Sequence, residues 1–355
     1  MILRIWSGVL PKINTQKDQF KINFMNMNPA DYFKNKSILV TGGTGSFGHY
    51  IVSELVKFQP KKIVVFSNDE DQQYHMRNEF REYSDVLEFM FGDVREYQRV
   101  FEAMKNIDVV YHAAALKHVP MTEFHPFEAV KTNVVGAENV RQAAIENNVE
   151  VVVTISTDKA VKPVNVMGMT KAIQERIMLN PVNRKSATRF VCVRYGNVIG
   201  SRGSVIPYFK EKIKKGEFLP VTSFKMTRFL LRLKEAMELV FKATMEGETG
   251  QLFVKKMPAC YIVDLAKAMA KGITSREDYP IKELGTRPGE KIHEILVSEE
   301  EMRRAIETEN YYTIYPYGKL EKPILLRGLN EYTSNNTQIL NQEEIISLLE
   351  KENWV

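Results

Sequence analysis

A short run of residues after an apolar segment carries the functional groups that proton transfer needs. Thr157, Asp158 and Lys159 are consecutive, and a helical stretch further along holds Met167 and Lys171. A hydroxyl can donate a hydrogen bond, a carboxyl can give up a proton, and a neutral amine can accept one. The thioether of Met167 cannot carry a proton. We therefore expect a catalytic set with Thr157 as donor, Asp158 as acid, Lys159 as base, Lys171 as a fixed positive charge, and Met167 inert among them.

Neighbouring Asp158 and Lys159 could also form an ordinary solvated ion pair in a loop. Their place at the carboxyl end of an apolar strand favours the functional interpretation, because α/β sheets bind ligands at that edge. Desolvation near a second cation, Lys171, would lower the pKa of Lys159 and make its amine a usable base. Tyr195, on the next apolar segment, is an alternative proton carrier, but a weaker one because it lies on a different strand.

A glycine-rich loop, TGGTGSFG at residues 41–48, follows the first apolar segment and precedes a helical pattern. Glycine allows the backbone to approach a pyrophosphate closely, and the N-terminus of the following helix offers free amides and a positive dipole end. A strand before the loop and a helix after it make this glycine spacing specific for dinucleotides. The loop residues expected to bind the cofactor are Gly42, Thr44, Gly45, Ser46, Phe47 and Gly48.

Further cofactor contacts are expected where later strands end at the same edge. Asp69 lies about 20 residues beyond the loop, where an acidic residue binds the ribose 2′-hydroxyl of NAD, and Ser67 and Asn68 precede it. Asp93, after the third apolar segment, is placed to reach the adenine, or alternatively to cap the helix that starts near Val94. The small residues Ala113, Ala114 and Ala115 follow the fourth segment, where a cofactor would cross the sheet edge.

The elements that must position these residues alternate along the chain. Apolar, β-branched segments at 38–41, 63–66, 87–91, 109–112, 151–155 and 189–194 are separated by helical patterns at 45–58, 94–104, 126–147 and 165–177. This alternation predicts an α/β fold: a Rossmann-type, doubly wound parallel sheet with a smaller C-terminal substrate-binding domain. We expect an N-terminal extension at 1–34, the NAD(P)-binding domain at 35–200 with a return segment near 227–247, and mainly substrate-binding structure at 201–355.

Composition narrows the class of protein further. The 355 residues are 44% hydrophobic and 26% charged, and the formal net charge of +5 is too small to indicate nucleic-acid binding. Two unpatterned cysteines, Cys192 and Cys260, give neither a disulfide framework nor a metal site and favour a reducing, cytoplasmic location. No apolar run reaches the length of about 20 residues that spans a bilayer. In the extension, Met25 or Met27 is an alternative start.

Several separated motifs together resemble one family. They are HAAALKHVP at 112–120, TN at 132–133, STDK at 156–159, RYGNV at 194–198, GSRGSV at 200–205, MTRF at 226–229 and RPGEK at 287–291. The chain from about residue 35 onward is similar to the UDP-N-acetylglucosamine 4,6-dehydratases, extended short-chain dehydrogenase/reductases of polysaccharide biosynthesis. The capsule-type dehydratase/5-epimerase branch, with Met in the position of the catalytic tyrosine, is the most similar branch.

This resemblance implies a reaction and its site residues. Bound NADP or NAD, tightly held and recycled, would take hydride from C4 of the sugar and return it to C6 after loss of water; no metal is expected. NADP is the family's preference, but Asn68 replaces an arginine that suits the 2′-phosphate. Val94, Lys117, Asn133 and Lys171 would add to the cofactor site. The implied substrate contacts are Lys117, His118, Asn197, Arg202, Ser204, Arg228, Arg287 and Glu290.

The expected partner is therefore a UDP-sugar, and the family further implies a homo-oligomer with no membrane or nucleic-acid partner. Two alternatives remain open. A nucleotide-sugar 4-epimerase would need a phenol to shuttle the 4-hydroxyl proton, which Met167 cannot replace. A non-catalytic dinucleotide-binding sensor would have no use for Thr157, Asp158 and Lys159 together.

Overall fold

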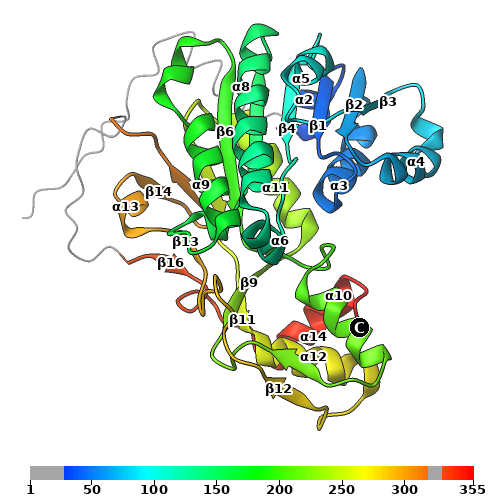
Figure 1. The fold of residues 1–355 in the computed structure, drawn as a ribbon, viewed down its shortest axis with the longest axis vertical. Helices are drawn as coiled ribbons and strands as arrows, with labels where there is room; N and C mark the ends of the chain where they lie inside the picture. The colour runs from blue at the N-terminus through cyan, green and yellow to red at the C-terminus, as the bar shows by residue number, and fades with distance from the viewer. Residues whose placement is uncertain (1–27, 319–329) are drawn as a thin grey trace, which may run out of the picture.

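The computed structural model describes residues 28–318 and 330–355, so most of the extension expected at residues 1–34 lies outside the described residues. The centre of the described structure is a sheet in the order β14-β15-β10-β6-β5-β4-β1-β2-β3 (Figure 1). Its strands are β1 (Ser37–Thr41), β2 (Lys62–Ser67), β3 (Leu87–Phe91), β4 (Val109–His112), β5 (Val151–Thr157), β6 (Arg189–Tyr195), β10 (Leu252–Lys255), β14 (Ala305–Glu307) and β15 (Tyr311–Ile314). Neighbours from β3 to β10 run parallel, whereas β15 and β14 add antiparallel pairs at one edge.

Helices cover both faces of this sheet (Figure 1). On one face, α5 (Tyr97–Ala103), α8 (Gly136–Glu146) and α9 (Val166–Met178) pack in a row, and on the other α11 (Leu233–Glu246) packs against α2 (Pro29–Phe33) and α3 (Ser46–Leu55). All residues of β1 and the first four of β5 are buried, which explains why these strands are continuous apolar runs. The predicted Rossmann-type, doubly wound α/β fold is confirmed, with the strand order reversing between β1 and β4.

The helical pattern at 126–147 folds as three pieces. They are α7 (Pro126–Ala129), a π-helical turn η3 (Val130–Val135) and α8, and the short helix α6 (Val119–Phe124) precedes them. Asn133 lies buried in the wide turn, where it accepts a hydrogen bond from the Leu116 amide and donates to Thr170 Oγ1. Such turns are frequent at functional sites. This one ties the helix to the segment that follows β4.

A smaller lobe lies beyond the carboxyl ends of the parallel strands (Figure 1). Its helices α10 (Val205–Lys214), α12 (Ile262–Thr274) and α14 (Gln342–Lys351) pack around a second apolar core that includes Phe209, Leu265 and Ile345. Its strands are β7 (Asn197–Val198), β8 (Leu219–Val221), β9 (Thr227–Leu231), β11 (Ala259–Tyr261) and β12 (Ile281–Glu283), which form two small sheets. A third small sheet, β13 (Ile295–Val297) paired with β16 (Tyr332–Thr333), lies beside the large sheet together with the short helix α13 (Glu299–Met302), and Leu296 and Tyr332 are part of the large-sheet core (Figure 1).

The chain passes between the two lobes more than once. From the expected return segment at 227–247, α11 packs against β5, β6 and β10 of the large sheet, while β9 pairs with β7 and β11 in the small lobe. The strands that join the large sheet after residue 200 are β10, β14 and β15. The domain boundaries expected from the sequence therefore stay predictions, and the lobes share several chain crossings.

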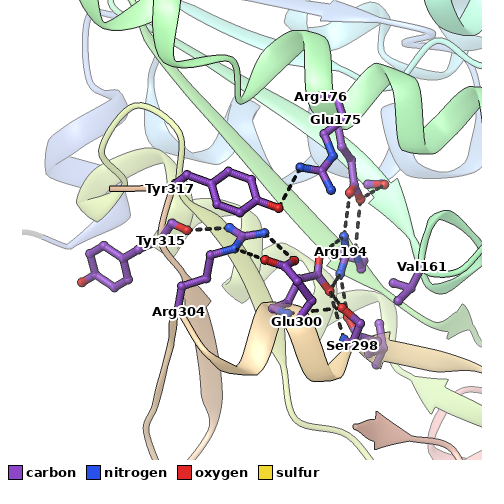
Figure 2. A network of polar contacts seen from close by, with 12 residues as sticks. Val161, Glu175, Arg176, Arg194, Ser298, Glu300, Arg304, Tyr315 and Tyr317 are labelled. Atoms are coloured by element: carbon purple, nitrogen blue, oxygen red, sulfur yellow. Dashed lines mark hydrogen bonds and ion pairs between the residues drawn. The ribbon is translucent and has the colours of Figure 1, made fainter. Parts of the chain in front are cut away.

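One buried arginine of β6 binds residues of α9, β13 and α13 (Figure 2). Arg194 of β6 donates to both oxygens of Glu175 on α9, at 3.0 and 2.6 Å, and to both oxygens of Glu301 on α13, at 3.0 and 2.9 Å. It also donates to the Leu296 carbonyl of β13 at 2.8 Å. Burial alone would raise the pKa of Glu301, but the Arg194 charge and its hydrogen bonds lower it to about 2. The guanidinium thus fixes the β13–α13 segment against the large sheet.

Replacing Arg194 with methionine should destabilise the fold strongly. The side chain is 2% exposed, and its removal leaves the carboxylates of Glu175 and Glu301 buried without their cation. Breaking a buried ion pair from one side costs about 3–5 kcal/mol. We expect the free energy of unfolding at pH 7, measured by urea denaturation followed by circular dichroism, to fall by about that amount.

The exposed Arg276, which pairs with Asp278, provides a matched control, and Arg276→Met should leave the free energy of unfolding unchanged. The pH dependence gives a second check. Because the pKa of Glu301 is depressed in the folded chain, its contribution is present above the unfolded pKa and is lost as pH falls toward about 2. The difference between the wild type and Arg194→Met should therefore shrink on acidification. An equal difference at pH 7 and pH 3 would contradict this account.

Candidate active site

The glycine loop lies between β1 and α3, where its backbone is open to a ligand. Gly42 has a φ of 65°, and a Cβ there would meet backbone atoms of Ala114 at 2.8 Å. A Cβ on Gly48 would lie 2.5 Å from the Gly42 carbonyl oxygen. Gly45 is the N-cap of α3 and makes no side-chain cap, so the amides of the first turn remain available to an anion. These residues fit the pyrophosphate of a dinucleotide.

The end of β2 lies against this loop and brings several predicted cofactor residues together. Thr44 Oγ1 is 2.8 Å from Ser67 Oγ, and Asn68 donates to an Asp93 carboxylate oxygen at 3.0 Å. The guanidinium of Arg95 binds the same oxygen at 2.6 Å. Burial alone would raise the pKa of Asp93, but hydrogen bonds from Arg95 and Asn68 hold it below its usual value. This corner of the loop is therefore lined by an ionised carboxylate.

Two acidic side chains here also have local structural roles. Asp69 is the N-cap of α4 (Glu70–Glu79), where its Oδ1 accepts a hydrogen bond from a first-turn amide at 3.0 Å. The alternative that Asp93 caps the next helix is wrong, because Glu96 occupies the N-cap position of α5. Asp93 instead accepts from the Arg95 amide at 2.9 Å, two residues further along. The turn after β3, not a helix end, orients its carboxylate.

The segment after β4 runs beside the loop, as the sequence predicts for residues 113–115. The Ala114 amide donates to Thr41 Oγ1 at 3.3 Å, which holds this segment against the end of β1. All three alanines are partly exposed, so they line an open edge of the sheet. Val94, by contrast, is 4% exposed and packs against Gly136 of α8, so the structure places its side chain in the core.

Two predicted binding residues link the lobes across the loop. Lys117 Nζ donates to the Arg202 carbonyl at 2.7 Å, and the Arg202 amide donates to Ser46 Oγ at 3.2 Å. The Arg202 guanidinium reaches Gln72 of α4 at 2.7 Å. His118 lies against the turn that follows Arg202. The turn at 201–204 therefore sits over the expected cofactor site, and Arg202 is nearer to the cofactor residues than the sequence predicts.

The proposed acid–base residues meet where β5 ends and the short helix η4 (Asp158–Ala160) turns the chain. Asp158 is fully buried, and its Oδ1 accepts hydrogen bonds from Thr157 Oγ1 at 2.9 Å and Lys159 Nζ at 3.0 Å. Lys159 Nζ also lies 3.4 Å from Glu294 Oε1, an oxygen that is 3.6 Å from Arg228 Nε. The structure thus joins Thr157, Asp158 and Lys159 in one cluster and adds a second carboxylate.

The charges of this cluster correct one expectation. Burial alone would lower the pKa of Lys159, but the carboxylates of Asp158 and Glu294 outweigh burial and raise it. The expectation of a lowered pKa for Lys159 is therefore wrong for the described chain, because two carboxylates surround its amine and stabilise the ammonium form. Burial raises the pKa of Asp158, and Lys159 opposes that shift only in part. Of the two carboxyls beside Lys159, Asp158 is therefore the one whose pKa is raised, whereas that of Glu294 is lowered by the cations around it.

Burial lowers the pKa of Lys171 to about 8. Its amine donates to the Ile155 carbonyl at 2.6 Å and to Gln174, whose amide nitrogen is 2.9 Å from His112 Nε2. His112 Nδ1 is in turn 2.8 Å from Thr41 Oγ1. Burial lowers the pKa of His112 to about 3, so the ring is neutral. Two of the three amine protons are thus fixed by protein acceptors.

Met167 lies four residues before Lys171 on α9 and is 4% exposed. It therefore occupies the same helix face as Lys171, as the sequence predicts. The neighbouring Gly168 explains the close approach of α9 to the acid–base cluster. A Cβ on Gly168 would lie 2.3 Å from the Lys159 carbonyl oxygen, so any larger residue would push the helix away from the end of β5.

Three predicted substrate residues retain unused polar atoms. Asn197 Oδ1, Ser204 Oγ and Glu290 Oε2 are buried and make no hydrogen bond within the described residues. Buried polar atoms are costly without a partner, so these atoms are suited to hydrogen-bond a ligand or water. Arg228 differs, because its guanidinium already donates to three backbone carbonyls. Arg287 lies on an exposed loop whose Gly289 carbonyl is held by the side chain of Asn165, the N-cap of α9.

Tyr195 lies closer to the cluster than the sequence indicates, since it pairs in register with Thr157 across β5 and β6. Burial raises the pKa of its phenol well above the usual value. A phenol that holds its proton this tightly is a poor base near neutral pH. The alternative that Tyr195 carries the proton is therefore not favoured by the environment of its phenol.

Four residues of the site were missed by sequence reasoning: Glu294, His112, Gln174 and Gly168. His112 is the first residue of the motif at 112–120, Gly168 lies in the helical pattern at 165–177, and Gln174 lies one turn beyond Lys171. Spacing from Lys171 could have identified Gln174 as a neighbour on α9. Nothing local identifies Glu294, which lies far along the chain and reaches the cluster only through the packing of β13 against η4.

The arrangement defines a class of protein. A dinucleotide loop at the strand switch point, a buried lysine four residues after the usual phenol position, and a carboxyl–amine cluster at the end of β5 are features of an extended short-chain dehydrogenase/reductase. The site can hold a nicotinamide dinucleotide beside groups that donate and accept protons. The lobe built around β9 and α12 covers this edge of the sheet (Figure 1).

Comparisons with known proteins specify the family. The family described as "Polysaccharide biosynthesis protein" matches residues 38–316. A Rickettsia canadensis protein named UDP-glucose 4-epimerase is 46% identical over 339 residues, covering 91% of this chain and 98% of that protein. A Methanocaldococcus jannaschii protein named an uncharacterized membrane protein is 44% identical, covering 91% and 97%. The X-ray structure of Pen from Bacillus thuringiensis is 38% identical with a TM-score of 0.85, covering 91% and 99%.

This chain therefore belongs to the polysaccharide biosynthesis family of extended short-chain dehydrogenase/reductases, which confirms the resemblance inferred from its motifs. Across residues 28–318 and 330–355, no helix combines the length and the apolar character that crossing a membrane requires. Cys192 and Cys260 are buried free thiols. The cytoplasmic location stays a prediction.

Proposed function

We propose that this protein is an NAD(P)-dependent UDP-N-acetylglucosamine 4,6-dehydratase, which forms a 4-keto-6-deoxy sugar by internal hydride transfer and loss of water. The observation that carries the proposal is the ion pair of buried Asp158 with partly buried Lys159 at the end of β5, beside a methionine in the phenol position. Dehydration requires an acid for the departing hydroxyl as well as a base. A simple reductase or epimerase requires one phenol, which Met167 cannot supply.

The glycine loop, with Gly42, Gly45 and Gly48, would hold the pyrophosphate of a nicotinamide dinucleotide, which when bound would supply reversible hydride transfer. Asp158, as carboxylate, takes the 4-hydroxyl proton, and Thr157 donates a hydrogen bond to the C4 oxygen. The 4-ketone acidifies the C5 hydrogen, which Lys159 removes. Asp158 then gives its proton to the departing 6-hydroxyl. In the inverting branch that this chain resembles, C5 would take a proton from solvent on the face opposite Lys159, and Lys159 would release its own proton to solvent.

The raised pKa of Lys159 is compatible with this order of steps. Its ammonium is stabilised by the carboxylates of Asp158 and Glu294. When Asp158 takes the 4-hydroxyl proton, one of those two negative charges disappears. The pKa of Lys159 must then fall, so the amine becomes a base at the stage when C5 is acidic. Lys171 contributes positive charge at the ribose through the one amine proton not held by Ile155 or Gln174.

Mass spectrometry of the reaction products tests the proposal. Purified protein with UDP-N-acetylglucosamine and cofactor should give a product lighter by one water. Asp158→Asn keeps the shape but not the acid and should lower kcat by about 10²–10⁴-fold while cofactor binding is retained. Asp278→Asn, at an 82% exposed side chain, is the matched control and should keep full activity.

The alternative is a nucleotide-sugar 4-epimerase, which the name of the Rickettsia relative favours. An epimerase would convert UDP-glucose or UDP-N-acetylglucosamine into an isomer of unchanged mass. A product of unchanged mass, resolved from substrate by chromatography, would overturn the dehydratase. No turnover of any UDP-hexose in the presence of cofactor would contradict both the dehydratase and the epimerase hypotheses and would favour a non-catalytic dinucleotide-binding protein.

For the cofactor, NAD is favoured over NADP by the environment of Asn68. Asn68 occupies the position where an arginine would suit a 2′-phosphate. It donates a hydrogen bond to the ionised carboxylate of Asp93, and Asp69 follows it directly in the chain. A 2′-phosphate would meet two carboxylates there. Fluorescence titration should show NAD binding at least ten-fold tighter than NADP, and Asn68→Arg should narrow that ratio. Tighter binding of NADP to the wild type would contradict the assignment.

Self-association as a homo-oligomer also belongs to this proposal, and an apolar surface supports it. Phe124 and Phe127 on α6 and α7 are 81% and 67% exposed, and Met169 and Ile173 on the adjacent α9 are about half exposed. Contiguous apolar surface of this kind marks interaction sites. Light scattering after gel filtration should show a dimer or larger assembly, which Phe124→Ser weakens. A monomeric wild type at assay concentration would contradict it.

A further inference from the structure

The second carboxylate of the acid–base cluster has no role in the steps above. Glu294 comes directly before β13, and its side chain is 3% exposed. Its Oε1 lies 3.4 Å from Lys159 Nζ and 3.6 Å from Arg228 Nε. Its Oε2 is buried and makes no hydrogen bond within the described residues. A buried carboxylate in this arrangement must be ionised and paired, because the cations around it offset the cost of burial.

The backbone of Glu294 is fixed as firmly as its side chain. The Glu294 amide donates a hydrogen bond to Ser334 Oγ at 2.9 Å, and the Glu294 carbonyl accepts one from the Ser334 amide at 2.8 Å. These two bonds hold the backbone in place. Two residues later, the Leu296 carbonyl is held by Arg194. Thr227 Oγ1 lies 2.7 Å from Ser334 Oγ, which connects this segment to β9. These hydrogen bonds to β6, β9 and Ser334 therefore fix the position of Glu294 beside Lys159.

We propose that Glu294 is a positioning residue that acts as the permanent counter-ion of Lys159 and so leaves Asp158 as the carboxyl that exchanges protons with the substrate. Lys159 lies between two carboxylates, and only one of them can be the proton carrier. Glu294 faces three cations, Lys159, Arg228 and Lys291, whereas Asp158 is fully buried and its hydrogen-bond donors are Lys159 and the neutral Thr157. The cations favour the charged form of Glu294, and burial favours the protonated form of Asp158.

The charges around Lys159 determine the sign of the effect of removing Glu294. The charged groups that face it are Asp158, Glu294 and Arg228, with Lys291 acting on both carboxylates. Glu294→Gln removes a negative charge from the cluster. Lys159 then loses one counter-ion, so its amine must give up its proton at lower pH. Asp158 loses a repulsive neighbour, so its carboxyl must ionise at lower pH too.

The direct test is the proton affinity of Lys159 in the protein without substrate. Acetylation by acetic anhydride at a series of pH values, read by peptide mass spectrometry, reports the fraction of free amine at Lys159. The midpoint for Lys159 should lie at lower pH in Glu294→Gln than in the wild type, and Glu294→Asp should restore part of the shift. Glu299→Gln, at an exposed glutamate on the same segment, should leave the midpoint unchanged. An unchanged midpoint in Glu294→Gln would overturn the proposal.

A second measurement rests on the proposed dehydratase activity. The acid limb of kcat/KM reports the pKa of the base in the free enzyme, which is Asp158 for the first proton transfer. Glu294→Gln should move that limb to lower pH and reduce kcat about ten-fold, because a weaker base takes the 4-hydroxyl proton. A uniform loss of activity at every pH would indicate a merely structural role. If the wild type shows no turnover, the proposed function fails, while the labelling experiment still decides the role of Glu294.

Circular dichroism and thermal unfolding distinguish these outcomes from misfolding. Glu294→Gln keeps the shape of the side chain, and the backbone hydrogen bonds to Ser334 do not involve it. A folded variant with an unshifted Lys159 midpoint counts against the proposal. If Glu294→Gln does not fold, Glu294→Asp, which keeps the charge and shortens its reach, must show a Lys159 midpoint between wild type and full loss of the counter-ion. A wild-type midpoint in that variant would overturn the proposal.

Discussion

The buried guanidinium of Arg194 is the interaction on which the site depends. It joins β6 to α9 through Glu175 and to the β13–α13 segment through Leu296 and Glu301 (Figure 2). Ser156, the residue before Thr157, donates to the same Glu175 at 2.5 Å. The strand that ends in the acid–base cluster and the segment that supplies Glu294 are thus fixed to one cation. Such a pair contributes little net stability, but it defines geometry because leaving either carboxylate unpaired is costly.

This constraint explains how the site can work without a phenol. A tyrosine at position 167 would place the proton-transfer group on a helix, α9, whereas Asp158 and Lys159 lie directly after the end of β5. Gly168 lets α9 approach that strand end closely, and Lys171 is held by Ile155 and Gln174 with a neutral His112 behind it. Met167 then fills space beside a charge network that other residues complete. Under the proposed function, this replacement would move proton transfer from α9 to the end of β5 and leave the expected cofactor residues in place.

Much of the fold was predictable, because parallel strands buried on both faces are continuous apolar runs, and β3 and β4 match the expected segments residue for residue. The glycine loop and the run Thr157–Lys159 were predictable as well, because the residues of each are consecutive in the sequence and follow a recognisable strand. The break in the helix at 130–135 was not, since Asn133 becomes a reason for a π-helical turn only once Leu116 lies beside it. The role of Asp93 depended in the same way on where α5 begins.

The charge state of Lys159 could not be predicted from its neighbours in the sequence. The expectation depended on Lys171, but Lys171 is absent from the interactions that set the pKa of Lys159, which come from Asp158, Glu294 and Arg228. Glu294 and Arg228 reach it through tertiary packing of β13 and β9, and no spacing rule connects these positions. Electrostatics inside a site depends on distances of a few ångströms, and these exist only after folding.

The central claim is that hydride moves within one sugar while Asp158 and Lys159 carry the protons. Deuterium placed at C4 of UDP-N-acetylglucosamine tests it most directly, with the product examined by NMR. The account predicts that the label appears in the C6 methyl group of a 4-keto product, and that in heavy water the C5 position also acquires deuterium. A label that returns to C4 of an epimeric product, or that is lost to solvent, would contradict it.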